Sequence, residues 1–125
     1  MIIGIGIDII EVTRIERLLT KQKRFQQRIF TETEIAYCES KKNKAQNYAG
    51  RFAAKEALLK AIGTGWRRGV SFKEIEIVNN ERGKPEIFLS GKAREVADDL
   101  GISNIQVSLS HLKEFATAVV TAEKG

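Results

Sequence analysis

The stretch "GRFAAKEALLKAIGTG", residues 50–65, constrains the fold most, because it continues a helical pattern of apolar residues that runs from about Ala45 to Ile62. At about 100° per residue, the large apolar side chains of this segment fall on one continuous arc. Gly63 or Gly65 can end the helix, since glycine commonly follows the last helical residue. The pattern predicts a long central helix that packs its arc against the rest of the domain.

Charged residues inside this helix allow two interpretations. Lys55 falls inside the apolar arc, whereas Glu56 and Lys60 lie at its edge beside small alanines. In the first interpretation, Glu56 and Lys60 form an ordinary i,i+4 ion pair worth about 0.2–0.5 kcal/mol, and the stem of Lys55 follows the apolar surface to reach solvent. In the second, the small neighbours leave room for a ligand, and backbone N–H groups of the Gly-Thr-Gly turn approach a phosphate. The helix pattern alone favours the ion pair.

The rest of the chain contains short elements of both kinds. Alternating or β-branched runs predict strands, while Thr13 and the capping box "TETE" predict helix starts. We expect strands at 2–12, 71–78, 85–89, 104–111 and 115–122, and helices at 13–29, 31–39 and 90–101. The strands do not alternate strictly with helices, so the predicted fold class is α+β, a small mixed domain in which the long helix packs on an antiparallel sheet. The 125 residues suit one domain, 1–125.

The first strand presents different residues on its two faces. The isoleucines at positions 3, 5, 7 and 9 point one way, and we expect them to enter the core. Gly4, Gly6 and Asp8 point the other way, which leaves a carboxylate beside two residues without side chains. The glycines either admit a neighbouring helix, with Asp8 acting as a cap, or let a ligand approach Asp8.

Two carboxylates on different elements, Asp8 and Glu56, suit a magnesium ion shared with a phosphate ligand. Magnesium prefers hard oxygen ligands and takes one or two carboxylates together with substrate phosphates and water. Zinc does not suit this sequence, because one histidine and one cysteine are too few for its usual ligand set. The single cysteine, Cys38, cannot form an internal disulfide, and we interpret it as a buried small residue of a cytoplasmic protein.

The formal net charge of +5 and the pI of about 9.5 favour an anionic partner, whether a nucleic acid, a phosphate-bearing ligand or an acidic protein. Basic residues in the segment 13–29 would fall within about 80° of arc on a single helix. We call these residues the basic stripe: Arg14, Arg17, Lys21, Arg24 and Arg28. A solvated face usually mixes charge signs, so the basic stripe favours a docking surface for an acidic partner.

Several other classes of protein fit the sequence less well. No segment approaches the about 18 uncharged apolar residues of a membrane span, and the apolar start contains Asp8, so we expect neither a membrane helix nor a signal peptide. Aromatic residues make up 7% of the chain and no nucleic-acid-binding motif is present, which argues against a small nucleic-acid-binding domain. A non-catalytic scaffold that binds acidic proteins through the basic stripe stays open.

Four motifs, in this order and at this length, resemble the short holo-acyl-carrier-protein synthases, the small type of 4'-phosphopantetheinyl transferase. The motifs are "GIGIDIIEVTRI" at the start, "GRFAAKEALLKAIGTG" in the middle, "GKP" at 83–85 and "SLSH" near the end. The resemblance covers essentially the whole chain. It implies transfer of phosphopantetheine from coenzyme A to a serine of an apo acyl carrier protein, with release of adenosine 3',5'-bisphosphate. It also implies a homotrimer with active sites at the subunit interfaces.

The resemblance assigns roles residue by residue. Asp8 matches the family's metal-binding aspartate, Glu56 the glutamate of its Lys-Glu motif, and Lys60 a lysine placed near the reacting phosphate. The basic stripe matches the surface that docks the acidic carrier protein. Further positions match the contacts with coenzyme A: Lys42, Lys44, Arg51, Gly63, Gly65, Gly83, Pro85 and His111.

The acceptor of the serine proton is left open by the sequence. A carboxylate, or a water held by one, is the natural acceptor. Larger relatives carry a second acid two residues after the first-strand aspartate, and that position is Ile10 here. We therefore expect a water to complete the metal shell.

Overall fold

The computed structural model describes residues 1–63 and 69–125, so Gly65, predicted to end the helix and to contact coenzyme A, lies outside the described residues. The described elements are β1 (Ile2–Glu11), α1 (Val12–Lys21), α2 (Phe25–Ile29), α3 (Glu32–Glu39), α4 (Lys44–Ile62), η2 (Phe72–Glu74), β2 (Ile75–Asn79), β3 (Pro85–Leu89), α5 (Gly91–Asp99), β4 (Asn104–His111) and β5 (Phe115–Glu123). The predicted α+β class is confirmed.

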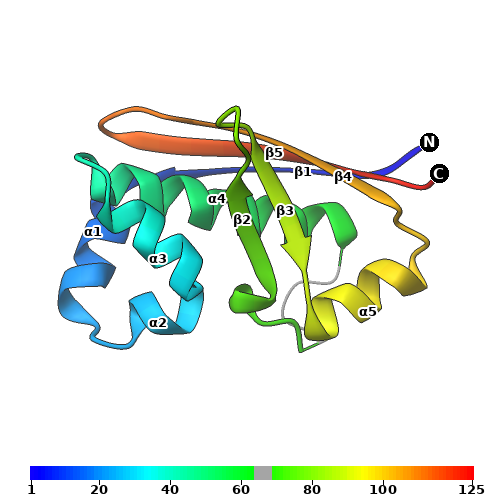
Figure 1. Cartoon of the computed structure of the whole chain (residues 1–125), viewed down its shortest axis with the longest axis horizontal. Helices are drawn as coiled ribbons and strands as arrows, with labels where there is room; N and C mark the ends of the chain where they lie inside the picture. The colour runs from blue at the N-terminus through cyan, green and yellow to red at the C-terminus, as the bar shows by residue number, and fades with distance from the viewer. Residues whose placement is uncertain (64–68) are drawn as a thin grey trace.

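The strands form two antiparallel sheets. Three strands pair in the order β1-β5-β4, and β2 pairs with β3 in a separate hairpin. Figure 1 shows that α4 runs along one face of the three-stranded sheet, while the helices and the hairpin lie on the far side of α4. No element of residues 1–63 or 69–125 covers the opposite face of the sheet. Within residues 1–63 and 69–125, every helix is too short or too polar to cross a membrane.

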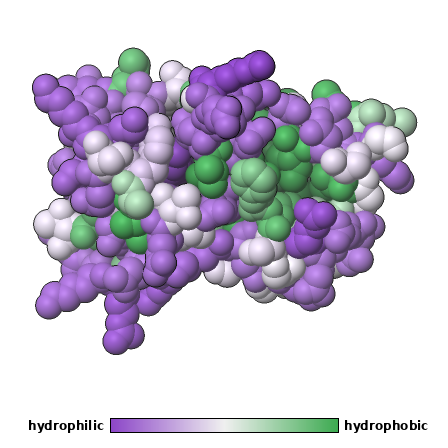
Figure 2. Space-filling view, in the orientation of Figure 1, coloured by the Kyte–Doolittle hydropathy of each residue, from purple (hydrophilic) through white to green (hydrophobic). Residues whose placement is uncertain are grey.

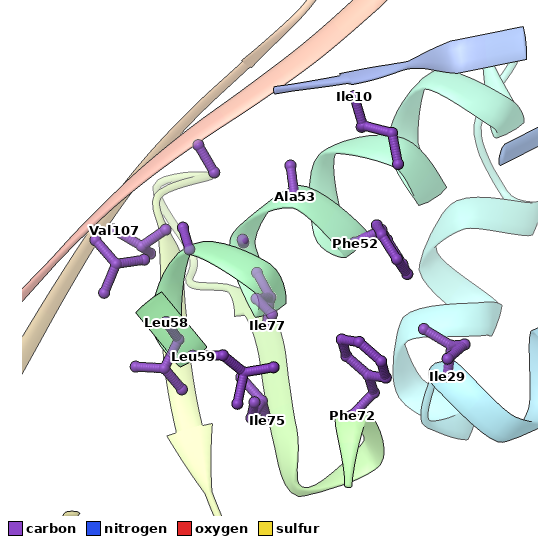
Figure 3. Close-up of a cluster of buried hydrophobic side chains, with 14 of the residues drawn as sticks. Ile10, Ile29, Phe52, Ala53, Leu58, Leu59, Phe72, Ile75, Ile77 and Val107 are labelled. Carbon is purple, nitrogen blue, oxygen red and sulfur yellow. The ribbon is translucent and has the colours of Figure 1, made fainter. Parts of the chain in front are cut away.

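The buried arc of α4 forms the centre of the core. Tyr48, Phe52, Leu58, Leu59 and Ile62 are all buried, as the helical pattern predicts. Figure 3 shows this arc facing the side chains of β2 and η2, where the ring of Phe52 stacks on that of Phe72 with centroids 5.4 Å apart. Gly63 ends the helix with a left-handed φ of 71°.

The predicted orientation of β1 is wrong. Ile5, Ile7 and Ile9 are 66%, 64% and 67% exposed, whereas Gly4 and Gly6 face α4. A Cβ at Gly6 would overlap the carbonyl oxygen of Ala57 and lie 2.8 Å from the backbone nitrogen of Ala61. The glycines therefore admit a neighbouring helix, α4, which is one of the two interpretations of the sequence. The isoleucines occupy the uncovered face of the sheet.

The single helix predicted for 13–29 is also wrong, because α1 ends at Lys21 and α2 begins at Phe25. Gln22 leaves the helix with an extended backbone, φ −114° and ψ 101°. The break turns Phe25 back onto the core, where its ring lies 6.2 Å from the rings of Phe30 and Phe52. Burial of this ring outweighs the local preference for a continuous helix.

Two further segments test the capping signals. The capping box of Thr31 and Glu34 at the start of α3 is present, as predicted. The strand predicted for 71–78 begins only at Ile75, because Ser71 and Glu74 form a second capping box around the short helix η2. The strands β3, β4 and β5 lie within one residue of their predicted ranges.

Candidate active site

A cluster of charges forms where β1 crosses α4. Lys60 Nζ donates to the backbone oxygen of Ile7 at 2.9 Å and to Asp8 Oδ1 at 3.2 Å. Lys60 thus pairs with Asp8 across two elements, and among the described residues it forms no ion pair with Glu56. The helix pattern alone favours an i,i+4 ion pair between Glu56 and Lys60, and the structure instead pairs Lys60 with Asp8.

Electrostatics place Glu56 in the same cluster. Burial raises the pKa of the Glu56 carboxyl, the Asp8 charge raises this pKa further, and Lys60 and Arg14 oppose both effects. Two carboxylates and two cations from β1, α1 and α4 therefore act on one another. Arg14, predicted to dock a partner, lies close enough to this cluster for its charge to act on Glu56.

The donor set of this cluster fits magnesium. Asp8 and Glu56 offer hard carboxylate oxygens, and their mutual repulsion is a cost that a bound cation would relieve. The described residues contain no group of three or more metal-ligating side chains, as a closed all-protein site would require. Two carboxylates are what magnesium takes when phosphate oxygens and water supply its remaining ligands.

A second cluster lines a pocket of about 390 Å³ between α4, β4 and the turn that joins β2 to β3. Four of the residues predicted to contact coenzyme A lie together here: Arg51, Gly83, Pro85 and His111. The Arg51 side chain is 2% exposed; its Nη2 donates to Asn79 Oδ1 at 2.7 Å, and its Nε has no hydrogen-bond partner among the described residues. Nδ1 of His111 lies 3.0 Å from Gln46 Oε1.

Other predicted contacts lie away from this pocket. Lys44 forms an ion pair with Glu39 at 3.3 Å and lines a separate hollow beside Tyr48. Lys42 is exposed in the loop before α4, and Gly63 is exposed at the far end of that helix. The basic stripe is exposed throughout, but it is divided between α1, the turn after it and α2.

A second hollow adjoins the pocket and shares Lys84 and Pro85 with it. Figure 2 shows a largely hydrophilic face with hydrophobic residues gathered right of the centre. Between β3, α5 and β4, the side chains of Ile87, Leu89 and Ile105 help to line a hollow of about 420 Å³. Of the predicted site residues only Pro85 lies there, so the charged clusters and not this hollow define the candidate site.

Lys55 and Cys38 are structural. Lys55 is fully buried, so its stem does not follow the apolar surface to solvent as the first interpretation of the helix holds. Its Nζ donates to Glu34 Oε1 at 2.8 Å and to the backbone oxygens of Phe72 and Ile75. Burial raises the pKa of the Cys38 thiol to about 12, which confirms its interpretation as a buried small residue rather than a nucleophile.

Comparison with known proteins decides the family. A sequence model of the 4'-phosphopantetheinyl transferase superfamily matches residues 4–120. This chain belongs to that superfamily. It is 48% identical over 125 residues to the holo-[acyl-carrier-protein] synthase of Geotalea daltonii, covering 99% of this chain and 100% of the relative.

Solved structures of the same superfamily share the fold. The Bacillus anthracis holo-(acyl-carrier-protein) synthase in complex with CoA (3',5'-ADP) matches with a TM-score of 0.83 and 44% identity, covering 100% of this chain and 99% of that one. The Helicobacter pylori enzyme in complex with coenzyme A matches with a TM-score of 0.84 and 37% identity, covering 95% and 99%. These similarities confirm the resemblance that the four motifs predict and do not favour the nucleic-acid-binding or scaffold alternatives.

Proposed function

We propose that this chain transfers the 4'-phosphopantetheine group from coenzyme A to a serine of an apo acyl carrier protein. The serine oxygen bonds to the phosphorus of the pantetheine phosphate, the bond from that phosphorus to the bridging oxygen breaks, and adenosine 3',5'-bisphosphate leaves. The observation that carries the proposal is the cluster in which Asp8, Glu56 and Lys60 meet across β1 and α4. Membership of the superfamily and relatives solved with coenzyme A support it.

The cluster supplies the groups that phosphoryl transfer needs. Asp8 and Glu56 would hold magnesium, which when bound neutralises pyrophosphate charge and makes the bisphosphate a better leaving group. Lys60, whose side chain is 55% exposed while bound to Asp8, can present its ammonium to a phosphate oxygen and stabilise charge that develops during transfer. The serine proton passes to a carboxylate of this cluster or to a water that such a carboxylate holds.

The pocket around Arg51 and His111 suits the nucleotide end of coenzyme A. A buried guanidinium with an unpartnered N–H at the wall of a pocket is best compensated by an anion, and coenzyme A carries phosphates on its ribose. Lys42, Lys44 and Gly63 lie outside this pocket within one chain. Their contact with coenzyme A therefore depends on how chains assemble.

Assembly follows from where the two clusters lie. Asp8 is on β1 and His111 on β4, the two outer strands of the order β1-β5-β4. Lys60 and Arg51 project from opposite sides of α4, about 13 Å apart along its axis. We infer that the cluster of one subunit meets the pocket of its neighbour in the homotrimer that the resemblance implies. The isoleucines on the uncovered face of β1 support such an interface, because apolar surface of this kind is normally buried.

The basic stripe is the proposed docking surface for the acidic carrier protein. Arg14 belongs both to the stripe and to the charges that act on Glu56, so a carrier protein bound there would bring its serine close to the cluster. A cytoplasmic location and a role in fatty acid biosynthesis complete the proposal. The single, free cysteine supports the location.

Mass spectrometry of an apo carrier protein tests this function. Incubation with coenzyme A, magnesium and this protein should add the mass of one phosphopantetheine group. Asp8→Ala and Glu56→Ala should abolish the gain, while circular dichroism shows that both variants stay folded. A wild-type protein that binds the carrier protein without adding mass would overturn the proposal in favour of a scaffold.

A further inference from the structure

Arg51 is a buried cation without an anionic partner. Its side chain is 2% exposed, and no carboxylate in residues 1–63 or 69–125 forms an ion pair with it. Two neutral groups hold it instead: Asn79 Oδ1, which accepts from Nη2 at 2.7 Å, and the Tyr37 ring, whose centroid lies 4.0 Å from Cζ. Burying a charge without an opposite charge is costly, so this arrangement needs a reason.

Asn79 connects Arg51 to the other walls of the pocket. Its Nδ2 donates to the backbone oxygen of Gly83 at 3.0 Å and lies 3.4 Å from the Tyr37 hydroxyl. Asn79 therefore joins α3, α4 and the turn after β2 at one point. The neighbouring Asn80 fixes the same turn through different hydrogen bonds, because its Oδ1 accepts from the backbone nitrogens of Arg82 and Lys84.

We propose that Asn79 and Tyr37 are positioning residues that hold the Arg51 guanidinium at the pocket wall with its positive charge uncompensated, ready for a phosphate. The proposal rests on the proposed function, which places the phosphate-bearing nucleotide end of coenzyme A in this pocket. A neutral amide fixes the guanidinium by a hydrogen bond and leaves its charge for the ligand. A carboxylate at position 79 would fix it at least as well but would cancel that charge.

This distinction predicts different effects for two substitutions at one position. Asn79→Ala releases the guanidinium and should weaken binding of adenosine 3',5'-bisphosphate by about tenfold, the size expected when a charge-assisted hydrogen bond loses its alignment. The KM for coenzyme A should rise by a similar factor with kcat nearly unchanged. Asn79→Asp should weaken binding at least as much, although its ion pair with Arg51 offsets part of the stability lost with the Nδ2 hydrogen bond to Gly83. Asn80→Ala, the matched control for loss of the turn's own hydrogen bonds, should weaken binding less than Asn79→Ala does.

Calorimetric titration of adenosine 3',5'-bisphosphate into these variants, with and without Arg51→Met, tests the proposal. If Asn79 acts through Arg51, Asn79→Ala should add little to the loss caused by Arg51→Met. The inference is overturned if Asn79→Asp binds as tightly as the wild type, or if the loss from Asn79→Ala persists in full in the Arg51→Met background. The inference is also overturned if Arg51→Met binds the bisphosphate as tightly as the wild type. Failure of the proposed function is a different result: the wild type does not bind the bisphosphate.

Discussion

Glycine at positions 4 and 6 sets how closely β1 approaches α4. Cβ atoms at these positions would meet the backbone of Ala57 and Ala61, which cannot yield as a flexible side chain does. The close approach brings the first half of β1 over the last turns of α4, and Lys60 there reaches both the Ile7 carbonyl and Asp8 near the middle of the strand. The two glycines carry no reactive group, but they determine that Lys60 and Asp8 come into contact.

Glu56→Gln should make the folded protein more stable at neutral pH. Burial, and then the Asp8 charge, raise the pKa of Glu56 above its ordinary value of 4.5. A carboxyl with a higher pKa in the folded state stabilises the fold fully below its unfolded pKa, and this contribution is lost as the pH rises through the folded pKa. The ionised carboxylate therefore lowers stability at neutral pH, and glutamine removes this effect.

Thermal unfolding of Glu56→Gln across a range of pH checks this prediction. The midpoint of Glu56→Gln should exceed that of the wild type by a few degrees near neutrality, and the two curves should converge in acid. Lys60→Gln should have the opposite effect, because it removes a cation that lowers the Glu56 pKa. A Glu56→Gln midpoint below the wild-type midpoint at neutral pH would mean that the ionised carboxylate is stabilising.

At the scale of elements, one buried ion pair joins four of them: α3, α4, η2 and β2. Lys55 on α4 binds Glu34 on α3, and Glu34 Oε2 also accepts from the backbone nitrogen of Ile77 on β2 at 2.9 Å. The same ammonium donates to the carbonyls of Phe72 and Ile75. Burial lowers the pKa of Lys55, and the Glu34 charge opposes this shift. The pair holds α4 in register with the elements that form the pocket.

Lys55→Met should lower the free energy of unfolding by about 3–5 kcal/mol, because it leaves the Glu34 carboxylate buried without its cation. Urea denaturation measures this loss. Adding Glu34→Gln should recover part of it, since a neutral amide is less costly to bury than an unpaired carboxylate. Lys60→Gln, which removes an exposed cation, should cost less than about 1 kcal/mol yet impair transfer. Equal losses for both lysines would contradict a special role for the buried pair.

Features with a local cause could be predicted from the sequence, and features with a distant cause could not. The arc of α4, the capping box at Thr31 and the hairpin of β4 and β5 depend on residues close together in the chain. The covered face of β1 depends on α4, and the partner of Lys55 lies 21 positions away. Alternation defines two faces of a strand without showing which of them is buried.

The candidate site follows the same rule. Asp8, Glu56 and Lys60 could be predicted because charges beside glycine and alanine are unusual, and the family motifs reinforced them. Tyr37 and Asn79 could not, since neither lies in a motif and each acts only through its contact with Arg51. No local signal marks a neutral residue that orients a distant cation.

At the scale of the whole molecule, one chain holds the two parts of the proposed site on opposite edges of its sheet. The uncovered face bears isoleucines along β1 and the polar residues Ser108 and Ser110 along β4. Neighbouring chains that pack on this face would bury the isoleucines. The resulting site would combine the Asp8 cluster of one subunit with the Arg51 pocket of the next, so each chain would supply two half-sites.

Co-expression of two inactive chains should restore activity if the site is shared in this way. Asp8→Ala removes a carboxylate from the charged cluster, and Arg51→Met removes the cation of the pocket. Each variant alone should therefore transfer little phosphopantetheine. Across all the trimers that assemble at random, about a quarter of the interfaces should join an intact cluster to an intact pocket, because either chain occupies each position with equal chance. Transfer activity of the co-purified mixture, followed by mass spectrometry of the carrier protein, measures this recovery.

Adding Ile7→Lys to both chains, which charges the exposed sheet face, should leave single chains of 14.0 kDa in light scattering and abolish the recovery. Mixed trimers that form and stay inactive would instead place the whole site within one chain.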